Sequence, residues 1–349
     1  MKKILVGLSG GVDSAVSAYL LKKQGYDVVA GFMINYLAPE GKFCPTKDDM
    51  KVAKEVAAYL NVPFFTFDYR ETYSDKVLDY MYDGYKKGIT PNPDIMCNSE
   101  VKFKVFLDEA LEHGFDGIAM GHYARIEKRG LGFHLKKGLD QNKDQSYFLA
   151  GLNQFQLSKA IFPIGKLEKS EVRKIALEVG LPNANRKDSQ GICFVGKVDM
   201  SDFLEKKIKP KPGVVKNTSG KILGEHKGVY YYTIGQRKGL DIGGQAEPIF
   251  VVKKDIEKNE IIVGTNSDLE LYDDKLFVSE FHYLGKNNFE FPLKAKCKIR
   301  YRQADQGCII YKEENKYRIE FSDKQRAIAS GQICAVYLDD DLVMSGVIS

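Results

Sequence analysis

The sequence predicts an α/β fold, a doubly wound parallel sheet, followed by two small β-rich units, the last of them a β-barrel. In the first half, apolar runs of strand length alternate with segments whose apolar residues recur at helical spacing. Such alternation is typical of a parallel sheet with helices on both faces. After 209–213 the helical periodicity disappears, and short alternating strands separated by Gly, Asn and Asp turns follow. We therefore expect domains at 1–208, 209–275 and 276–349.

The composition is that of an ordinary globular chain with a mildly basic balance. The 349 residues are 44% hydrophobic and 28% charged, and the formal net charge is +5. This charge fits a polyanionic partner without requiring one. No apolar stretch reaches the ~18 residues of a membrane span, and the basic start runs straight into a strand, unlike a signal peptide. We expect a cytoplasmic protein without membrane contact.

Cysteine usage argues against a disulfide framework and against the common zinc motifs. The chain has six cysteines, and no two of them form Cys-x-x-Cys. In a reducing cytosol such residues are either buried spectators or reactive thiols. We predict no resident metal ion. The cysteines are Cys44, Cys97, Cys193, Cys297, Cys308 and Cys334.

The elements of the first domain alternate along the chain. Asn98 is the expected N-cap of its fourth helix, and Gly114 is the expected stop. Ligands of such folds bind at the carboxyl ends of the strands, where the loops at 9–14 and 88–98 are expected. Strands are predicted at 2–8, 27–34, 63–69 and 117–123, a hairpin at 124–138, and helices at 12–24, 48–60, 71–87, 99–113, 168–179 and 199–208.

The turn at 9–14 reads Ser-Gly-Gly-Val-Asp-Ser and joins the first strand to the first helix. Backbone N–H groups and the positive helix end suit an anion there, and the glycines let the backbone approach it. The turn is neither a Walker A loop nor Gly-x-Gly-x-x-Gly; an ordinary βα turn is the alternative. Its six letters resemble the PP-loop of the N-type ATP pyrophosphatases, Rossmann-like enzymes that cleave ATP between the α and β phosphates.

Two cysteines of the first domain are candidates for thiol chemistry. Cys97 lies at the end of the Pro-rich loop 92–98, where the dipole of the following helix would lower its pKa. Cys193 follows a glycine in a polar loop. Each could be a small buried cysteine, and only the fold can bring them together. As a pair they suit redox chemistry or sulfur transfer.

A stretch of the last domain alternates cations with apolar residues. Five cations would share one strand face, and they repel one another unless an anion neutralises them. A solvated strand face is the alternative; we interpret the row as a stripe for RNA phosphates. The cations are Lys294, Lys296, Lys298, Arg300 and Arg302.

Further motifs extend the resemblance to one family, the bacterial tRNA 2-thiouridylases. They occur in the order of that family and span nearly the whole chain, although Gln190 stands where Thr is common and the linking loops are short. The motifs are Asn-Pro-Asp-Ile-Met-Cys-Asn at 92–98, Gly-His-Tyr at 121–123, Asp-Gln-Asn-Lys-Asp-Gln-Ser-Tyr-Phe at 140–148, Lys-Asp-Ser-Gln-Gly-Ile-Cys-Phe at 187–194, Thr-Ile-Gly-Gln-Arg-Lys-Gly-Leu at 233–240 and Arg-Tyr-Arg at 300–302.

The resemblance implies a reaction that uses ATP and Mg²⁺. The enzyme would adenylate O2 of the wobble uridine (U34) in the tRNAs for Lys, Glu and Gln. A persulfide on Cys193, loaded by a cysteine desulfurase or a sulfur relay protein, would deliver sulfur to C2. Cys97 would then attack the persulfide linkage, with Asp94 as general acid/base. The products would be 2-thiouridine, AMP and pyrophosphate, with a Cys97–Cys193 disulfide left on the enzyme.

The resemblance also implies binding residues. Alone, His122 would more often be a satisfied histidine at a strand end, and 143–145 an ordinary solvated loop. ATP would be held by Gly7, Leu8, Ser9, Gly10, Gly11, Val12, Asp13, Ser14, Met33 and Gly121. The target base would contact Asn92, Pro93 and Asp94. The rest of the tRNA would contact His122, Lys143, Asp144, Gln145, Arg300, Tyr301 and Gln332.

Three alternatives stay open at the level of sequence. The chain could be another PP-loop enzyme that adenylates a different substrate and needs neither cysteine. It could be a non-catalytic tRNA-binding protein with a relict nucleotide site. Asp94, Cys97 and Cys193 could hold an iron–sulfur cluster, for which thiolate ligands are usual. The sequence specifies neither the sulfur donor, the tRNA preference, the oligomeric state nor the division of roles between the two cysteines.

Overall fold

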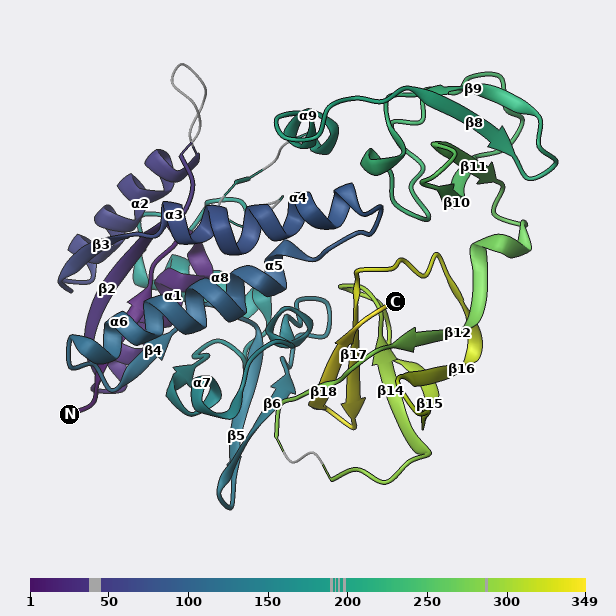
Figure 1. The fold of residues 1–349 in the computed structure, drawn as a ribbon. Coiled ribbons are helices and arrows are strands. Elements are labelled where there is room, and N and C mark those ends of the chain that lie inside the picture. Colours follow the sequence, from purple (N-terminus) through teal and green to yellow (C-terminus); the bar gives the residue numbers. More distant parts are fainter. Residues whose placement is uncertain (38–44, 189–190, 192, 194, 197–198, 286–287) are drawn as a thin grey trace.

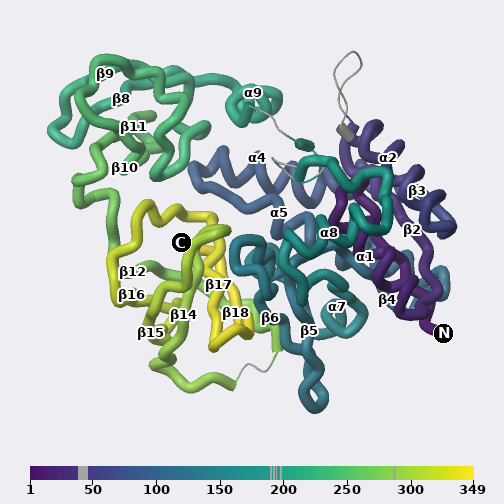
Figure 2. Tube along the Cα trace, turned by 180° about the vertical axis from the view of Figure 1, so that it is seen from behind, coloured from purple at the N-terminus to yellow at the C-terminus, as the bar shows by residue number. Residues whose placement is uncertain are grey.

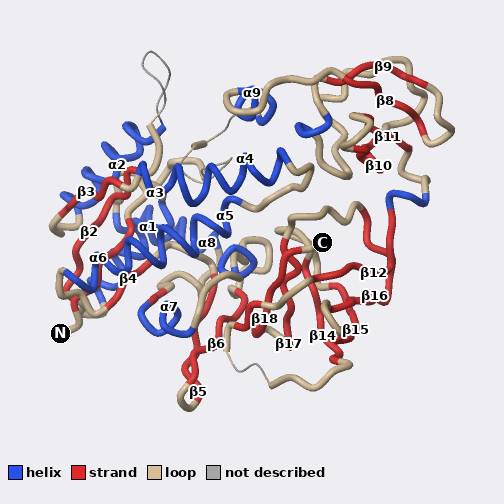
Figure 3. Tube along the Cα trace, in the orientation of Figure 1, coloured by secondary structure: helices blue, strands red, loops and turns tan. Residues whose placement is uncertain are grey.

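A computed structural model describes residues 1–37, 45–188, 191, 193, 195–196, 199–285 and 288–349 (Figure 1). Cys44 and Gln190 lie outside the described residues. A helix-covered sheet forms one end of the molecule, and two β-rich parts lie at the other end (Figure 3). Within the described residues, no helix has both the length and the apolar character needed to cross a membrane.

The first part contains a parallel sheet whose strand order is β3-β2-β1-β4-β7. Each neighbouring pair is parallel. Strand order reverses between β1 and β4, so their carboxyl ends form the crevice where such sheets bind ligands. The strands are β1 Lys3–Gly7, β2 Asp27–Ile34, β3 Phe64–Asp68, β4 Gly117–Ala119 and β7 Ala160–Ile161.

Helices cover both faces of this sheet, as the apolar runs predict. Ile4 and Val6 of β1 face one buried cluster, whereas Leu5 faces the other. The first face carries α1 Val12–Lys23, α2 Pro45–Tyr59 and α8 Lys169–Val179. The second carries α3 Arg70–Tyr73, the π-helix η1 Ser74–Leu78, α4 Asp79–Lys86, α5 Pro93–Met96, the π-helix η2 Cys97–Val105 and α6 Phe106–Glu112. Shorter elements are η3 Ser146–Leu149, α7 Gln154–Lys159 and α9 Met200–Glu205.

The helix that carries Cys97 begins earlier than the sequence predicts. Asn92 is its N-cap, since the side chain accepts a hydrogen bond from the Ile95 N–H at 3.2 Å, and Pro93 occupies the first turn. Proline is favoured at that position because its missing N–H would have no intrahelical partner. Asn98, the predicted N-cap, is therefore inside the helix, and so is Cys97.

The two β-rich parts follow in sequence. The middle part has strand order β10-β11-β8-β9 and one short helix: β8 Gly213–Asn217, β9 Ile222–His226, η4 Val229–Tyr231, β10 Phe250–Asp255 and β11 Glu260–Gly264. The last part contains η5 Leu269–Leu271, β12 Tyr272–Val278, β13 His282–Tyr283, β14 Leu293–Lys298, β15 Gln306–Lys312, β16 Tyr317–Arg326, β17 Ile333–Leu338 and β18 Asp341–Val347.

The hairpin of the first part extends the sheet of the last part. It consists of β5 Ala124–Arg129 and β6 Gly132–Lys137. β6 pairs with β18, so the sheet runs β12-β16-β15-β14-β17-β18-β6-β5, with β13 on β18 (Figure 1). Main-chain pairing therefore holds the last part in place against the first.

All three parts meet at the segment that precedes α5 (Figure 2). The Thr90 N–H donates to Ser330 O at 2.8 Å, and Thr90 O accepts from Gln332 Nε2 at 2.8 Å, both from the last part. Thr90 Oγ1 lies 3.0 Å from Thr233 Oγ1 of the middle part. The start of the Cys97 helix is thus held from two sides.

Candidate active site

The turn 9–14 forms a cradle of backbone groups at the carboxyl end of β1. Gly10 has φ +77°, and a Cβ there would lie 2.5 Å from Asp49 O, so only glycine fits. Gly11 caps α1 without a side-chain hydrogen bond to the first-turn N–H groups. Ser14 Oγ accepts from the Ser9 N–H at 3.1 Å and donates to Gly11 O at 3.0 Å. These features leave backbone donors and a positive helix end available to an anion.

Residues from neighbouring strands close around the cradle. A Cβ on Gly121 would lie 2.8 Å from Ser14 N, so the chain after β4 packs directly against the turn. A Cβ on Gly7 would lie 2.6 Å from Met120 Sδ and 3.3 Å from Met33 Cε. The structure therefore brings residues after β1 and β4 together around this turn, and ATP binding by these residues stays a prediction.

A network of charged side chains flanks the cradle, and no motif in the sequence predicts it. Lys169 at the start of α8 lies 2.7 Å from Asp13 and 2.8 Å from Asp188. Asp188 also pairs with Lys143 at 2.9 Å and with Arg173 at 2.6 Å. Burial would raise the pKa of Asp188, but the hydrogen bonds from Lys169 and Lys143 hold it below its usual range. The network anchors the start of the loop that carries Cys193.

The fold brings Cys97 and Cys193 together. Their Sγ atoms are 3.7 Å apart. The Cys193 N–H donates to Asp94 Oδ1 at 3.1 Å, and Tyr73 Oη donates to Cys193 O at 2.6 Å. Cys97 and Met33 both belong to the buried cluster on the second face of the parallel sheet. Such a pair can exchange between thiol and disulfide or pass a sulfur atom between its members.

The two thiols differ in acidity, opposite to the sequence-based prediction. Burial raises the pKa of Cys97 well above its ordinary value. Cys97 also lies within the helix and not before its N-terminus, where the dipole would lower the pKa. The hydrogen bond with Cys97 lowers the pKa of Cys193 to about 7, with a further contribution from the charge of Lys102. Burial also raises the pKa of Asp94. At neutral pH the nucleophilic thiolate is therefore Cys193.

Comparison with known proteins identifies the family. Residues 2–197 match a family described as the tRNA methyl transferase HUP domain, 201–265 the tRNA methyl transferase PRC-barrel domain, and 273–348 the aminomethyltransferase beta-barrel domain. A protein of Shouchella clausii named tRNA-specific 2-thiouridylase MnmA is 45% identical over 349 residues, which cover 99% of this chain and 96% of that protein. A protein of the same name from Christiangramia forsetii is 44% identical over the full length of both chains.

The chain belongs to the tRNA-specific 2-thiouridylase family. The predictions of the family, of the sulfurtransferase class of enzyme, and of a parallel-sheet domain followed by β-rich units and a β-barrel are confirmed. The domain boundaries that we place at 1–208, 209–275 and 276–349 remain a proposal.

Several of the residues predicted to contact tRNA make internal contacts in this chain. The ring of His122 is buried between Phe103 and Phe162, and burial lowers its pKa well below its ordinary value. Tyr301 packs against Phe148, with ring centroids 4.3 Å apart. The others are held by hydrogen bonds or ion pairs: Lys143 to Asp188, Asp144 to Ser146, Gln145 to Tyr123 and Gln332 to Thr90. Their contacts with tRNA stay predictions.

The prediction that five cations at 294–302 form a continuous row on one strand face is wrong. β14 ends at Lys298, which is 8% exposed and lies 3.1 Å from Asp144 Oδ2. This lysine is neutralised inside the protein and not by a phosphate. Arg300 follows the end of the strand and Arg302 has φ +62°, so neither continues the strand face. Only Lys294 and Lys296 of the row remain exposed on β14.

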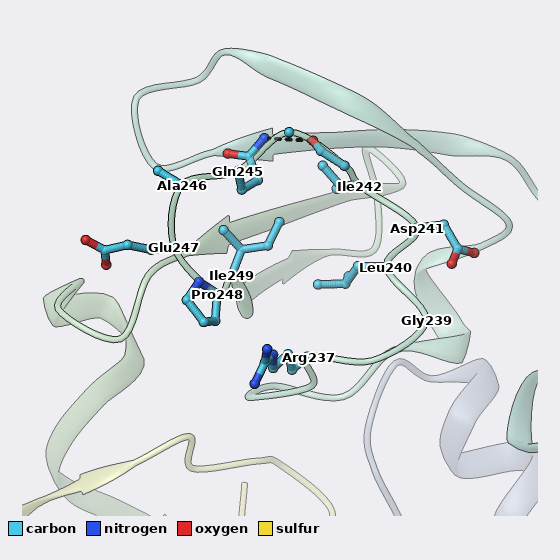
Figure 4. A pocket seen from close by; sticks show the side chains of 12 residues that line it. Arg237, Gly239, Leu240, Asp241, Ile242, Gln245, Ala246, Glu247, Pro248 and Ile249 are labelled. Carbon is cyan, nitrogen blue, oxygen red and sulfur yellow. Dashed lines mark hydrogen bonds between the residues drawn. The ribbon is translucent and has the colours of Figure 1, made fainter.

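Two other features of the structure lie outside the thiol pair and the cradle. Among the described residues, no three His, Cys, Asp or Glu side chains are grouped so that they could hold a metal ion. In the middle part, a cavity of about 620 Å³ is lined by the chain from Arg237 to Ile249 and includes the end of the 233–240 motif (Figure 4). Its lining includes Arg237, Asp241 and Glu247 and contains no cysteine.

Proposed function

We propose that this protein catalyses the ATP-dependent 2-thiolation of the wobble uridine of tRNA. The observation that carries the proposal is the Cys97–Cys193 pair, 3.7 Å apart, in a chain that also keeps an anion cradle at the switch point of its sheet. A synthetase that only adenylates would need the cradle but not the thiols. Membership of the tRNA-specific 2-thiouridylase family supports a tRNA substrate, and we propose the tRNAs for Lys, Glu and Gln.

Adenylation solves a chemical problem of the uracil ring. The C2 carbonyl is a poor electrophile and its oxygen is a poor leaving group, so the oxygen is first joined to the α-phosphorus of ATP and pyrophosphate departs. The backbone donors of 9–14 would bind the departing phosphates. Mg²⁺ would shield their charge, and Asp13 offers a carboxylate beside the cradle, although Lys169 pairs with it here. The anticodon base must leave its stack to reach the site, and Asn92, Pro93 and Asp94 would receive it.

Sulfur transfer then uses both thiols. The terminal sulfur of a Cys193 persulfide attacks C2, and AMP leaves with the former O2. Cys97 attacks Cys193 Sγ, so that the bond between Sγ and the transferred sulfur breaks and its electron pair stays on the sulfur of 2-thiouridine. The Sγ atoms need to close from 3.7 Å to the ~2.05 Å of a disulfide. Asp94, whose pKa is raised by burial, would take the proton of Cys97.

The acidities support this division of roles. Loading requires a thiolate that accepts sulfur from a donor protein, a cysteine desulfurase or a relay protein, and Cys193 is the more acidic thiol. Cys193 is also the more accessible of the two, since Cys97 is fully buried. We propose that the enzyme acts in the cytoplasm, where tRNA and a sulfur donor protein would meet it.

A thiolation assay tests the proposal. Purified protein is incubated with unmodified glutamate tRNA, ATP, Mg²⁺, a cysteine desulfurase and cysteine, and nucleosides are measured by mass spectrometry. We expect 2-thiouridine from the wild type, a loss of at least about 10³-fold in Cys97→Ser and Cys193→Ser, and near wild-type product from the matched control Cys334→Ser in the barrel.

Other outcomes would overturn parts of the proposal. Product from Cys193→Ser would remove Cys193 as the carrier. AMP and pyrophosphate without a thiolated base, and without dependence on either cysteine, would indicate a different adenylated substrate. Binding of tRNA without pyrophosphate release would indicate a relict nucleotide site. Iron and a visible absorption band in anaerobically purified protein would indicate that these residues hold an iron–sulfur cluster and do not form a disulfide.

A further inference from the structure

We propose that Lys102 is a positioning residue that holds the sulfur of Cys193 as an anion for loading and transfer. The inference rests on the proposed sulfur transfer and assigns a role to a side chain that no motif in the sequence singles out. Lys102 does not react with substrate; it acts through Cys193.

The local helix geometry places Lys102 beside the thiols. Cys97–Val105 is a π-helix, in which the backbone hydrogen bonds join residues five apart and bring them toward the same side of the helix. In an α-helix, residues five apart would point about 140° away from each other. The π-helical turn therefore turns Lys102 toward the side on which Cys97 meets Cys193.

The contacts of Lys102 converge on the sulfur site. Its ammonium hydrogen-bonds the Cys193 thiol and interacts with the charges of Cys97 and Asp94. Burial alone would lower the pKa of Lys102, but these acidic neighbours raise it, so the lysine stays charged. A charged lysine favours the anionic form of the sulfur that it contacts.

The other groups around Cys193 do not supply a positive charge. Cys97 and Asp94 are acids, and Tyr73 is a buried hydroxyl that donates to the Cys193 carbonyl. Tyr36 lies near Tyr73, and a tyrosine side chain carries no positive charge. His122, behind Lys102, is held neutral by burial and by the lysine charge. Among the described groups facing Cys193, the cation is Lys102.

The chemical step that this contact serves is balanced without an oxidant. The Cys193 thiolate attacks the terminal sulfur of a donor persulfide. A bond forms between that sulfur and Cys193 Sγ, the S–S bond of the donor breaks, and the donor leaves as a thiolate. One thiolate is exchanged for another, so nothing is oxidised overall, and the ammonium keeps its proton throughout.

Alkylation of Cys193 tests the charge role without tRNA, ATP or a donor. Full-length protein reacts with iodoacetamide across a pH series, and the rate at the Cys193 peptide is followed by mass spectrometry. We expect a wild-type midpoint near pH 7. Lys102→Met and Lys102→Gln should shift it upward by about one pH unit and slow alkylation at pH 7 about tenfold. Lys102→Arg, which keeps the charge, should stay within about twofold of wild type.

Lys104→Met is the matched control, because Lys104 lies on the same helix, is exposed and pairs with Glu100 at 2.8 Å. It should leave the profile unchanged. An unshifted midpoint in folded Lys102→Met or Lys102→Gln would overturn the proposal, as would equal shifts in Lys102→Arg and Lys102→Met, which would show a packing role. Failure of the wild type to thiolate tRNA would overturn the proposed function instead, and the alkylation profile would still report on Lys102.

Discussion

Within the part of the chain that the structure describes, neighbouring thiols form two groups, and the two groups differ in their surroundings. In the first part, Cys97 and Cys193 are 3.7 Å apart. In the barrel, Cys297 and Cys308 are closer still, at 2.9 Å, and Cys297 also contacts Cys334. If proximity made a sulfur-transfer site, the barrel would be the stronger candidate.

Surroundings separate the two groups. The barrel thiols sit on β14, β15 and β17 in a cluster of Ile, Val, Phe and Met side chains. Burial, and then the neighbouring thiols, raise the pKa of Cys297 well above its ordinary value. Cys193 instead lies in a loop, partly accessible, with the Lys102 charge beside it. Reactivity follows from a charge partner and access, not from the distance between sulfurs.

The largest expected difference is in reaction with iodoacetamide at about pH 8. Cys193 should react in the native protein, whereas Cys297, Cys308 and Cys334 should react only in molecules that have opened. Since opened molecules are a fraction of about 10⁻³ or less, the barrel peptides should be modified at least about 10³-fold more slowly. Peptide mass spectrometry measures both rates in one sample.

A urea series supplies the control for that prediction. The barrel cysteines should become reactive together, at the urea concentration where the barrel unfolds. Alkylation of Cys297 in native buffer at a rate close to that of Cys193 would contradict the comparison.

A smaller effect is expected when the barrel cluster loses one thiol. Cys297→Ser places a hydroxyl among thiols and apolar side chains, where it lacks a good partner, and should lower the free energy of unfolding by about 1–3 kcal/mol. Urea denaturation measures the loss. Thiolation per folded molecule should be unchanged, in contrast to Cys97→Ser; a loss of thiolation in stably folded Cys297→Ser would give the barrel thiols a part in the reaction.

The sequence predicts best what neighbouring residues decide. The apolar run of β1, the glycine turn and α1 are all local, and the structure has them as predicted. The sequence predicts the helix start at Asn98 and the structure has it at Asn92. Both asparagines are good N-caps, and proline is common in loops as well as in first turns of helices. Local signals did not choose between them.

Contacts between residues far apart in the sequence could not be predicted. Alternation placed Lys298 on a strand face, but it could not reveal that Asp144, far away in sequence, lies beneath it. The pairing of β6 with β18 brings those two regions together. The sequence does not predict a role for Lys102, because residues five apart point in different directions on an α-helix. Only the π-helix at Cys97–Val105 brings Lys102 toward the side of Cys97.

The smallest expected effect is a dependence of the unfolding free energy on pH that comes from Cys193. The pKa of Cys193 is about 7 in the folded protein, below the ~8.5 of an unfolded cysteine. Between these values the unfolded chain binds more protons, so stability should rise with pH. The contribution is fully present above the unfolded value and is lost as pH falls through about 7. Its size should be about 1–2 kcal/mol.

Two differences in unfolding free energy isolate this contribution from other titrating groups. The difference between wild type and Cys193→Ser should grow by that amount between about pH 6 and pH 9, since the serine cannot ionise. The difference between wild type and Cys297→Ser should instead shrink as pH rises, because burial raises the pKa of the Cys297 thiol above that of an unfolded cysteine. Urea midpoints at the two pH values measure both. A Cys193 difference that shrinks as pH rises would mean that burial, and not the neighbouring charge, controls this thiol, and the two groups of cysteines would then be alike.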